Sequence, residues 1–410
     1  MPKALIVSLG GTIDPIIKSI EEHKPDYLFF FLSKESNANE YPKVRAYLDE
    51  KRFSPKIDFS MVKDIDDLVH CYERASELAS EIEKQGIPSK DVVVDYTGGT
   101  KTMSAAIVLA TVTKGFRFSY VGGEKRTKKG LGVVKSGFEE VKTGLSPWQV
   151  LAVEERKKIA LFFNSYQFSA AKNIAERLDK VLSGLDKALH ESLSVLIEGY
   201  RLWDSFNHAG ALKILSQAQK KLSEYLGFKE DLVLSEFVKS VVGNLDFLGK
   251  IQIEKYNMVF DLFDNAKRRA EEGKYDDAVA RLYRALEMIG QIEFEKKFGC
   301  STSDAKSEKL PESLREEIVK KHMSTDGKIK IPLFDTFRIL TESGNKYGST
   351  FFANQKEIGN VLEARNSSIL AHGINPIPKE RYEKLSTILE DFLKHTGLNY
   401  KVEFPKLRWE

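Results

Sequence analysis

The stretch that decides the fold is VVVDYTGGTKTM, Val92–Met103, which runs straight into the pattern SAAIVLATVTKG. Its first part is a run of β-branched residues, which favours a buried strand. Gly98 and Gly99 then predict a tight turn that a ligand can approach closely, because glycine has no side chain and tolerates unusual backbone angles. The small and apolar residues after Met103 predict a helix. A strand, a turn and a helix start therefore follow one another directly.

Such a turn lies at the carboxyl end of a strand, where open α/β sheets bind ligands. The first amides of the following helix have no intrahelical partner, and the helix dipole favours an anion beside them. Lys101 adds a positive charge at the same place. The turn is therefore predicted to bind a negative group such as a phosphate. Turn chemistry and helix capping by threonine would explain the same residues, so a purely structural role stays open.

Two common phosphate motifs do not fit. A P-loop requires glycine, four residues and then Gly-Lys-Ser/Thr, whereas Thr100 separates Gly99 from Lys101 and no glycine stands at the upstream position. The dinucleotide fingerprint G-x-G-x-x-G belongs in the first strand–helix unit. That unit reads ALIVSLGGTIDPII here and lacks the spacing.

Residues 1–145 alternate apolar strands with amphipathic helices, which predicts a Rossmann-like α/β domain with a doubly wound, mostly parallel sheet. Asp14 is expected to cap the first helix, with Pro15 at its first position. A hairpin of 132–135 with 139–142 is expected to close the domain. Strands are expected at 4–9, 27–32, 57–62, 92–96 and 117–121, and further helices at 43–51, 65–84 and 102–114.

The rest of the chain reads as all-α. We expect a helical connecting domain at 146–264, without a fixed repeat period, and a second helical domain at 265–410. The second domain begins with a helix, a turn at Gly273-Lys274 and a long amphipathic helix. Its later parts are expected to be a loop-rich insertion at 300–330, helices near 356–372 and 379–395, and a short terminal strand, YKVEF.

Composition sets limits on the function. A chain of 410 residues with 42% hydrophobic and 30% charged residues has room for two or three ordinary globular domains. The net charge of +3 neither requires nor excludes a nucleic-acid partner. Cys71 and Cys300 lie far apart, which argues against a disulfide framework or a zinc site and suits a cytoplasmic protein. No apolar run approaches the roughly 18 residues of a membrane span, and the N-terminus does not resemble a signal peptide.

A candidate catalytic motif stands in EARNSSILAHG, 363–373. On one α-helix Arg365 and His372 would share a face, roughly 10 Å apart along the axis, and Gly373 would end that helix. An arginine can neutralise charge on a pentavalent phosphate, and a histidine can transfer a proton at neutral pH. The pair therefore suits RNA cleavage without a metal. Because one helix cannot close a compact site at that separation, a second copy from a two-fold partner is expected to complete it.

The spacing alone is weak evidence, because RLWDSFNH, 201–208, and REEIVKKH, 315–322, share it. Aromatic residues in the first predict a packing helix, and two glutamates in the second would repel an RNA phosphate. Arg365 is the one followed by a neutral polar residue, Asn366. A structural role for His372, as a helix-terminal histidine stabilised by the dipole, stays open.

Together the motifs resemble the CARF–HEPN ancillary ribonucleases of type III CRISPR systems. DYTGGTKTM resembles the ligand-binding turn of CARF domains, and SLGGT, Ser8–Thr12, resembles their first-strand loop. RNSSILAH, 365–372, fits the HEPN signature of an arginine, four to six residues and a histidine, with a polar residue after the arginine. YDDAVARLYRALE resembles the first long helix of HEPN domains in this group.

The resemblance implies a homodimer without stable association with the effector complex. Its paired CARF domains would bind a cyclic oligoadenylate, of four or six adenylates, as an allosteric activator. The residues implied to line that cleft are Ser8, Gly10, Gly11, Thr12, Thr97, Gly98, Gly99, Thr100, Lys101, Thr102 and Met103.

The resemblance also implies that paired HEPN domains place two copies of Arg365, Asn366 and His372 in one composite site. That site would cut single-stranded RNA without metal or another cofactor, leaving a 2′,3′-cyclic phosphate and a 5′-hydroxyl. Two alternatives stay open. The chain could be a non-catalytic nucleotide sensor on a helical scaffold, or its CARF domain could also cleave the activator, with Asp95 as the candidate base near Lys101.

Overall fold

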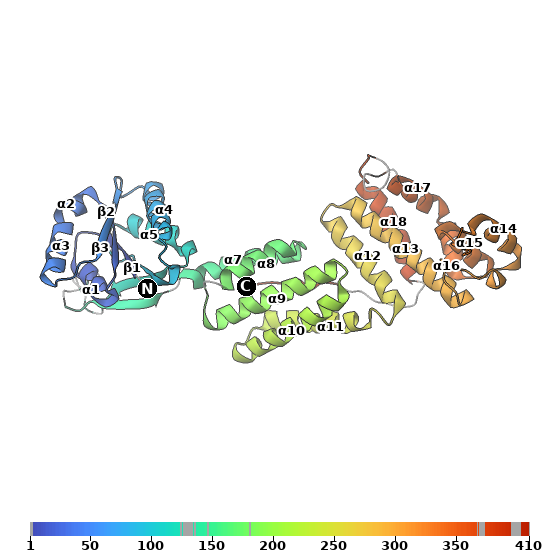
Figure 1. The fold of residues 1–410 in the computed structure, drawn as a ribbon, viewed down its shortest axis with the longest axis horizontal. Helices are drawn as coiled ribbons and strands as arrows, with labels where there is room; N and C mark the ends of the chain where they lie inside the picture. Colours follow the sequence, from blue (N-terminus) through green and yellow to red (C-terminus); the bar gives the residue numbers. More distant parts are fainter. Residues whose placement is uncertain are drawn as a thin grey trace. The chain divides into compact units, whose positions relative to one another are not determined.

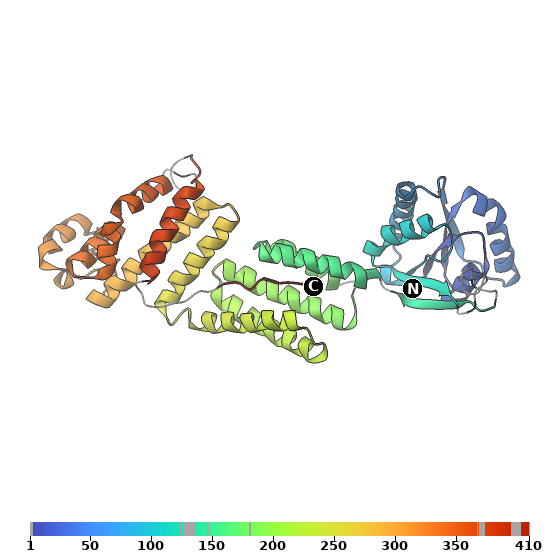
Figure 2. The same cartoon turned by 180° about the vertical axis from the view of Figure 1, so that it is seen from behind.

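The computed structural model describes residues 3–123, 125, 134, 137–145, 147–179, 182–366, 368, 374–394 and 403–409. The chain divides into two compact units. One comprises Met1–Glu155 with Arg177–Asp186, and the other comprises Arg156–Glu176 with Lys187–Glu410. The first unit contains the sheet, and the second unit is helical (Figure 1, with the reverse view in Figure 2).

The first unit is built on a six-stranded sheet with the order β3-β2-β1-β4-β5-β6 (Figure 1). Every pairing is parallel except that of β6, which runs antiparallel to β5. The predicted Rossmann-like, mostly parallel sheet is therefore confirmed. The strands are β1 (Ala4–Leu9), β2 (Tyr27–Ser33), β3 (Lys56–Val62), β4 (Val92–Asp95), β5 (Arg117–Gly122) and β6 (Glu140–Leu145).

Helices cover both faces of this sheet. Leu5 and Val7 of β1 pack on one face with α1 and α3, whereas Ala4 and Ile6 pack on the other face with α4 and α5. Because both faces are buried, the inner strands read as continuous apolar runs instead of alternating patterns. The helices of this unit are α1 (Asp14–His23), α2 (Lys34–Asn39), α3 (Tyr41–Glu50), α4 (Leu68–Lys84) and α5 (Lys101–Thr111), with short 3₁₀ turns η1 (Ser89–Asp91) and η2 (Val112–Lys114).

Two details of this unit differ from expectation. Asp14 is the first residue of α1, and its cap is Ile13, which makes no side-chain cap hydrogen bond. Pro15 is tolerated inside the first turn because amides there have no helical partner. The segment expected to form the second arm of a hairpin lies in β6, which pairs with β5. Most of the expected first arm, 132–135, lies outside the described residues.

The helical character predicted for the rest of the chain is confirmed (Figure 1). The helices up to residue 250 are α7 (Pro147–Asn164), α8 (Phe168–Asp179), α9 (Gly184–Asp204), α10 (His208–Phe228) and α11 (Leu232–Lys250). Those that follow are α12 (Lys255–Glu271), α13 (Tyr275–Phe298), η3 (Ser307–Lys309), α14 (Glu312–His322), α15 (Leu333–Glu342), α16 (Lys346–Ala353), α17 (Gln355–Asn366) and α18 (Lys379–Lys394).

The core of the C-terminal helices is organised around α12 and α13, which lie side by side (Figures 1 and 2). Gly273, with φ of +75°, closes the predicted turn between them. The domain boundary expected between residues 264 and 265 falls inside α12, because Leu262, Phe263 and Ala266 of that helix all enter the same core. The helix and its core therefore continue through that point.

Two further expectations for this region need correction. The segment 300–330 is more ordered than expected, because α14 forms there and buries Ile318 in a small core with Phe294 and Ile329. The helix expected at 356–372 ends at Asn366, and Ser368 instead forms an isolated bridge with Asn375.

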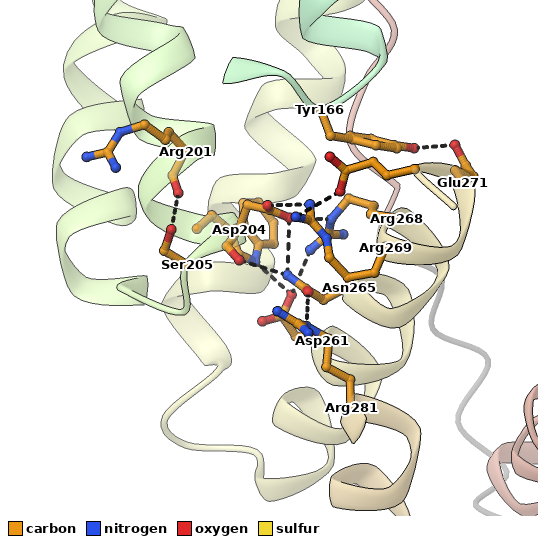
Figure 3. A network of polar contacts seen from close by, with 12 residues as sticks. Tyr166, Arg201, Asp204, Ser205, Asp261, Asn265, Arg268, Arg269, Glu271 and Arg281 are labelled. Atoms are coloured by element: carbon orange, nitrogen blue, oxygen red, sulfur yellow. Dashed lines mark hydrogen bonds and ion pairs between the residues drawn. The ribbon is translucent and has the colours of Figure 1, made fainter. Parts of the chain in front are cut away.

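A polar network ties α9 to α12 (Figure 3). Asp204, the last residue of α9, accepts hydrogen bonds from Arg268 Nε at 2.9 Å and Arg269 Nη2 at 2.6 Å. Asp261 of α12 is buried and accepts a hydrogen bond from Trp203 Nε1 at 2.8 Å. Paired and hydrogen-bonded in this way, the buried charges fix α9 and α12 to each other.

The segment 403–409 packs along the same helices. Phe404 is buried, with its ring centroid 4.8 Å from that of Tyr200 and 4.9 Å from that of Trp203. The side chain of Asn164 donates to Leu407 O and accepts from Leu407 N, each at 2.8 Å. The expected terminal strand is absent at Glu403 and Phe404, and its other residues lie outside the described part of the chain.

Candidate functional site

The two motifs of the first unit meet at the carboxyl end of the sheet. β1 and β4 are neighbours and pair in parallel, with Val7 opposite Asp95. The chain turns from β1 towards β2 and β3 on one side and from β4 towards β5 on the other. This is the topological switch point of the sheet, where open α/β folds bind ligands. The turn after β1, at Gly10 and Gly11, therefore lies beside the turn after β4.

The two turns approach each other so closely that they require glycine. A Cβ on Gly98 would overlap the carbonyl oxygen of Ser8, and a Cβ on Gly10 would lie 2.6 Å from Gly99 N. Gly99 also has φ of +80°, which disfavours any other residue. The expectation that both Gly98 and Gly99 admit a ligand needs correction for Gly98, which lies against Ser8 and Gly10. Gly99 lies against Ser8 and Met103 and also lines the cavity described below.

Asp95, at the end of β4, is fully engaged inside the protein. Its side chain is 0% exposed. Oδ2 accepts hydrogen bonds from the hydroxyls of Ser19 and Ser119, both at 2.8 Å, and Oδ1 accepts from Thr97 N at 3.0 Å. This carboxylate fixes the turn and is not presented to solvent beside Lys101. The role of a catalytic base for activator cleavage is therefore not supported by its surroundings.

The threonine hydroxyls of the second turn are also used internally. Thr100 caps α5, accepting from Met103 N at 3.2 Å and donating to Ile65 O at 2.9 Å. Thr97 Oγ1 accepts from Val121 N at 2.7 Å. These bonds set the geometry of the turn and leave the start of α5 as the group that can face an anion.

A cavity of about 250 Å³ opens beside these turns. Of the residues predicted to bind a ligand, five line it: Gly10, Gly11, Gly99, Thr100 and Met103. Six others do not line it: Ser8, Thr12, Thr97, Gly98, Lys101 and Thr102. The sequence reasoning missed the remaining lining residues: Leu9, Ser33, Glu35, Ser36, Asn39, Glu40 and Ile65.

Most of the missed residues come from the junction of β2 and α2. Ser33 ends β2 and caps α2 by accepting from Ser36 N at 3.1 Å. The sequence did contain a signal for these residues. β2 is a buried strand, and in a parallel sheet its carboxyl end lies at the same edge as the carboxyl ends of β1 and β4. This side of the cavity carries acidic groups, Glu35 and Glu40, and Glu40 pairs with Lys43 at 2.9 Å. The side favourable to an anion is therefore the start of α5.

Lys101 is the first residue of α5 and is exposed. Among the described residues no carboxylate forms an ion pair with its side chain. Its charge adds to the positive end of the α5 dipole, outside the residues that line the cavity.

The second candidate site lies at the end of α17. Arg365 is partly buried, and its Cζ atom lies 5.1 Å from the ring centroid of Tyr283 on α13. Arg365 Nη1 donates to Asn366 Oδ1 at 3.1 Å. His372 lies outside the described residues. Because α17 ends at Asn366, the expected placement of Arg365 and His372 on one continuous helix is not observed.

The histidines of the two competing Arg–His pairs are held by buried carboxylates. His208 is 5% exposed and bonds through Nε2 to Asp261 Oδ2 at 2.7 Å. His322 is 12% exposed and bonds through Nε2 to Asp335 Oδ2 at 2.6 Å. Burial acts to raise the pKa of Asp335, but hydrogen bonds from Lys321 and His322 outweigh it and lower that pKa. Both histidines therefore have structural partners.

The described residues contain no group of three or more histidine, cysteine, aspartate or glutamate side chains arranged to hold a metal ion. Within the same ranges, no helix combines the length and apolar character needed to span a bilayer.

Family comparisons identify the helical part of the chain. The model of the Csm6 6H domain matches residues 151–248, and the model of the Csm6 HEPN domain matches residues 249–396. The two matches adjoin and together cover more than half of the 410 residues. The HEPN match begins before the boundary expected at 264/265. A search of curated protein sequences found no significant match.

Comparison with solved structures gives a match over the whole chain. Enterococcus italicus Csm6 bound to cyclic hexa-2′-fluoro-hexa-dAMP has a TM-score of 0.65 and 14% identity, covering 98% of this chain and 96% of that one. At that identity the likeness shows a shared fold. Can2 from Sulfobacillus thermosulfidooxidans in complex with cyclic tetra-adenylate has 17% identity over 43% of this chain and 50% of that one, and its TM-score of 0.25 is too low to carry an argument.

The α/β sheet, the helical 6H segment and the terminal HEPN segment occur here in one order and over nearly the full length of a solved relative. The chain therefore belongs to the Csm6 family of CARF–HEPN ancillary proteins of type III CRISPR systems.

Proposed function

We propose that this protein is an endoribonuclease of type III CRISPR antiviral defence that a cyclic oligoadenylate activates. The observation that carries the proposal is Arg365-Asn366 at the end of α17, inside the segment that matches the Csm6 HEPN domain. Arg365 forms no ion pair with a carboxylate among the described residues, so its charge is available to an RNA phosphate. The alternative histidines, His208 and His322, both bind carboxylates.

The proposed reaction is an internal transesterification of single-stranded RNA. The ribose 2′-oxygen attacks the adjacent phosphorus while the bond from phosphorus to the 5′-oxygen breaks. The proton leaves the 2′-OH and a proton is delivered to the 5′-oxygen, with His372 as the transferring group. Arg365 neutralises the charge on the phosphoryl oxygens, and Asn366 hydrogen-bonds to Arg365. The products are a 2′,3′-cyclic phosphate and a 5′-hydroxyl, and no metal takes part.

The activator is proposed to bind where the turns after β1 and β4 meet. The cavity of about 250 Å³, the start of α5 and the exposed Lys101 support this location. A cyclic tetra- or hexa-adenylate is much larger than such a cavity, so one subunit would hold only part of the ring. This size difference supports a homodimer in which two CARF domains share one activator. The similar Csm6 structure is described as bound to a cyclic hexanucleotide analogue.

The proposal divides the chain into three parts. Residues 1–145 sense the activator, the segment that matches the Csm6 6H domain connects, and the segment that matches the Csm6 HEPN domain cuts RNA. Two copies of Arg365, Asn366 and His372 form one composite site in the dimer. Activator binding favours the arrangement of the HEPN pair in which that site is complete, which is a coupling between two distinct sites. The protein would act in the cytoplasm, where it would meet both RNA and activator.

The test is an RNA cleavage assay in EDTA, with and without cyclic tetra- or hexa-adenylate. We expect cleavage that one of the two ligands stimulates, that EDTA does not inhibit and that His372→Ala abolishes. His322→Gln is the matched control, because it alters a histidine of the same domain whose partner is Asp335. Absence of stimulated cleavage, or wild-type cleavage by His372→Ala, would contradict the proposal.

A further inference from the structure

Tyr283 is held in place by its surroundings on α13. Its neighbours Leu282 and Leu286 enter the core, whereas Tyr283 itself is partly buried. Burial and a hydrogen bond to Glu287, one helical turn further on, raise the pKa of Tyr283 to about 12. Arg284 Nη1 in turn donates to Glu287 Oε2 at 3.2 Å. The phenol of Tyr283 therefore has a hydrogen-bond partner on its own helix.

The ring of Tyr283 contacts the guanidinium of Arg365. The distance of 5.1 Å from Cζ to the ring centroid lies within the range of a cation–π contact. Such a contact attracts the guanidinium without consuming its N–H donors. One donor of Arg365 bonds to Asn366, and among the described residues no carboxylate pairs with the rest.

Arg281, two residues before Tyr283 on α13, is held by polar partners as well as by the ring of Phe206. Its Nε donates to Asn265 Oδ1 at 2.5 Å, and its Nη1 pairs with Asp277. An arginine bound in that way must give up a carboxylate before it can bind a phosphate. Arg365 has no such competitor in the described part of the chain, so the aromatic ring positions it while leaving its charge available.

We propose that Tyr283 is a positioning residue for RNA cleavage: its ring holds the guanidinium of Arg365 so that free N–H donors face the scissile phosphate. The inference rests on the proposed function of Arg365. A long arginine side chain at a helix end otherwise samples many rotamers, and fixing it beforehand lowers the barrier of the chemical step. Tyr283 acts through Arg365 and does not itself transfer a proton, because its hydroxyl is committed to Glu287.

The experiment compares Tyr283→Leu, Tyr283→Phe and Tyr275→Leu in the full-length protein with saturating activator. Tyr275 is a matched control, since it is a partly buried tyrosine of α13 whose ring lies 6.0 Å from that of Tyr382. Loss of the ring in Tyr283→Leu should lower kcat about tenfold with a smaller change in KM for RNA. Tyr283→Phe keeps the ring and should stay within about twofold of wild type, as should Tyr275→Leu.

A double-mutant cycle then separates positioning from general damage. In an Arg365→Ala background, measured under single turnover at high enzyme concentration, Tyr283→Leu should have no further effect. Full additivity of the two substitutions would overturn the inference, and so would a Tyr283→Phe variant as impaired as Tyr283→Leu. If Tyr283→Leu does not fold, Tyr283→Met supplies the same comparison, because methionine fills the site without a ring.

The inference and the proposed function fail in distinguishable ways. If wild type does not cleave RNA, or if Arg365→Ala cleaves normally, the proposed function fails. If wild type is active, Arg365→Ala is strongly impaired and Tyr283→Leu matches wild type, the positioning role alone is overturned. Activator binding and the midpoint of thermal unfolding are measured for each variant, and only folded, activator-binding variants enter the comparison.

Discussion

At Gly98 the sequence predicted the local turn but not the contacts that the turn makes. Two glycines after an apolar strand predicted the turn correctly. The pattern did not reveal that Gly98 lies against Ser8 O and Gly10 against Gly99 N, because contacts between two turns depend on which strands are neighbours. The candidate cation Arg365 was likewise found from its neighbours in sequence, whereas its contact with Tyr283 comes from the packing of α17 on α13.

Gly98→Ala is expected to destabilise the first unit, because the added methyl group would overlap the carbonyl oxygen of Ser8. Overpacking of this kind costs about 1–3 kcal/mol. Gly11→Ala is the matched control, since a Cβ there meets nothing within 4 Å. Denaturant unfolding of the full-length variants measures the difference. Equal free energies of unfolding for the two variants would show that the turns do not touch as described.

At the scale of elements, the strands and long helices were predicted closely from the sequence, whereas the short polar helices were not. β1 and β2 are apolar on both faces, and β5 is buried at four of its six positions. Turn residues bound all three strands, so their ends were predicted to within one residue. α14 was missed because its sequence, ESLREEIVKKH, is mostly charged and buries only Leu314 and Ile318. Its place is fixed by contacts with α15, which no local pattern encodes.

Asp335 provides a test of that helix contact. Asp335 lies in the first turn of α15. Its Oδ2 atom bonds to Lys321 Nζ at 2.9 Å and to His322 Nε2 at 2.6 Å, both from α14. These bonds lower the pKa of Asp335 below its unfolded value, despite burial. A carboxyl with a lowered folded pKa stabilises the fold above its unfolded pKa, and this contribution is lost as the pH falls towards the folded pKa.

We therefore expect the difference in free energy of unfolding between wild type and Asp335→Asn to shrink on acidification. The relevant window lies from about pH 5 downward, where aspartate titrates in the unfolded and folded states. Denaturant titrations at several pH values measure it, and Asp304→Asn, an exposed aspartate of the same region, serves as the control. A difference that stays constant across this window would contradict the ion-pair account.

At the scale of the whole molecule, the order of the α/β part and the helical part could be predicted from the hydrophobic patterns of the sequence. The contacts in the second unit between residues far apart in the chain could not. Asn164 and Leu407 hydrogen-bond although 243 positions separate them. The segment 403–409 brings Phe404 over Arg268, with 3.9 Å from Cζ to the ring centroid. Nothing near Phe404 in the sequence indicates that partner, so the sequence predicted a strand there instead.

Phe404→Ala is expected to destabilise the second unit by about 3–5 kcal/mol, as for other buried phenylalanines. The loss combines the cavity left among Tyr200 and Trp203 with the lost contact to Arg268. Phe228→Ala, at a side chain that is 78% exposed, should be nearly neutral. Thermal and denaturant unfolding measure both variants. A neutral Phe404→Ala would mean that the terminal segment does not pack on these helices.

We propose that an anion bound at the start of α5 switches on a separate cleavage site at the end of α17. The most direct test measures activator binding and RNA cleavage in the same preparations of wild type, Lys101→Ala and Arg365→Ala. Loss of one charged contact should weaken activator binding to Lys101→Ala by about tenfold or more, with cleavage recovering at high activator concentration. Arg365→Ala should bind activator as wild type does and lose most of its RNA cleavage. Unchanged activator binding by Lys101→Ala together with wild-type cleavage by Arg365→Ala would contradict the account.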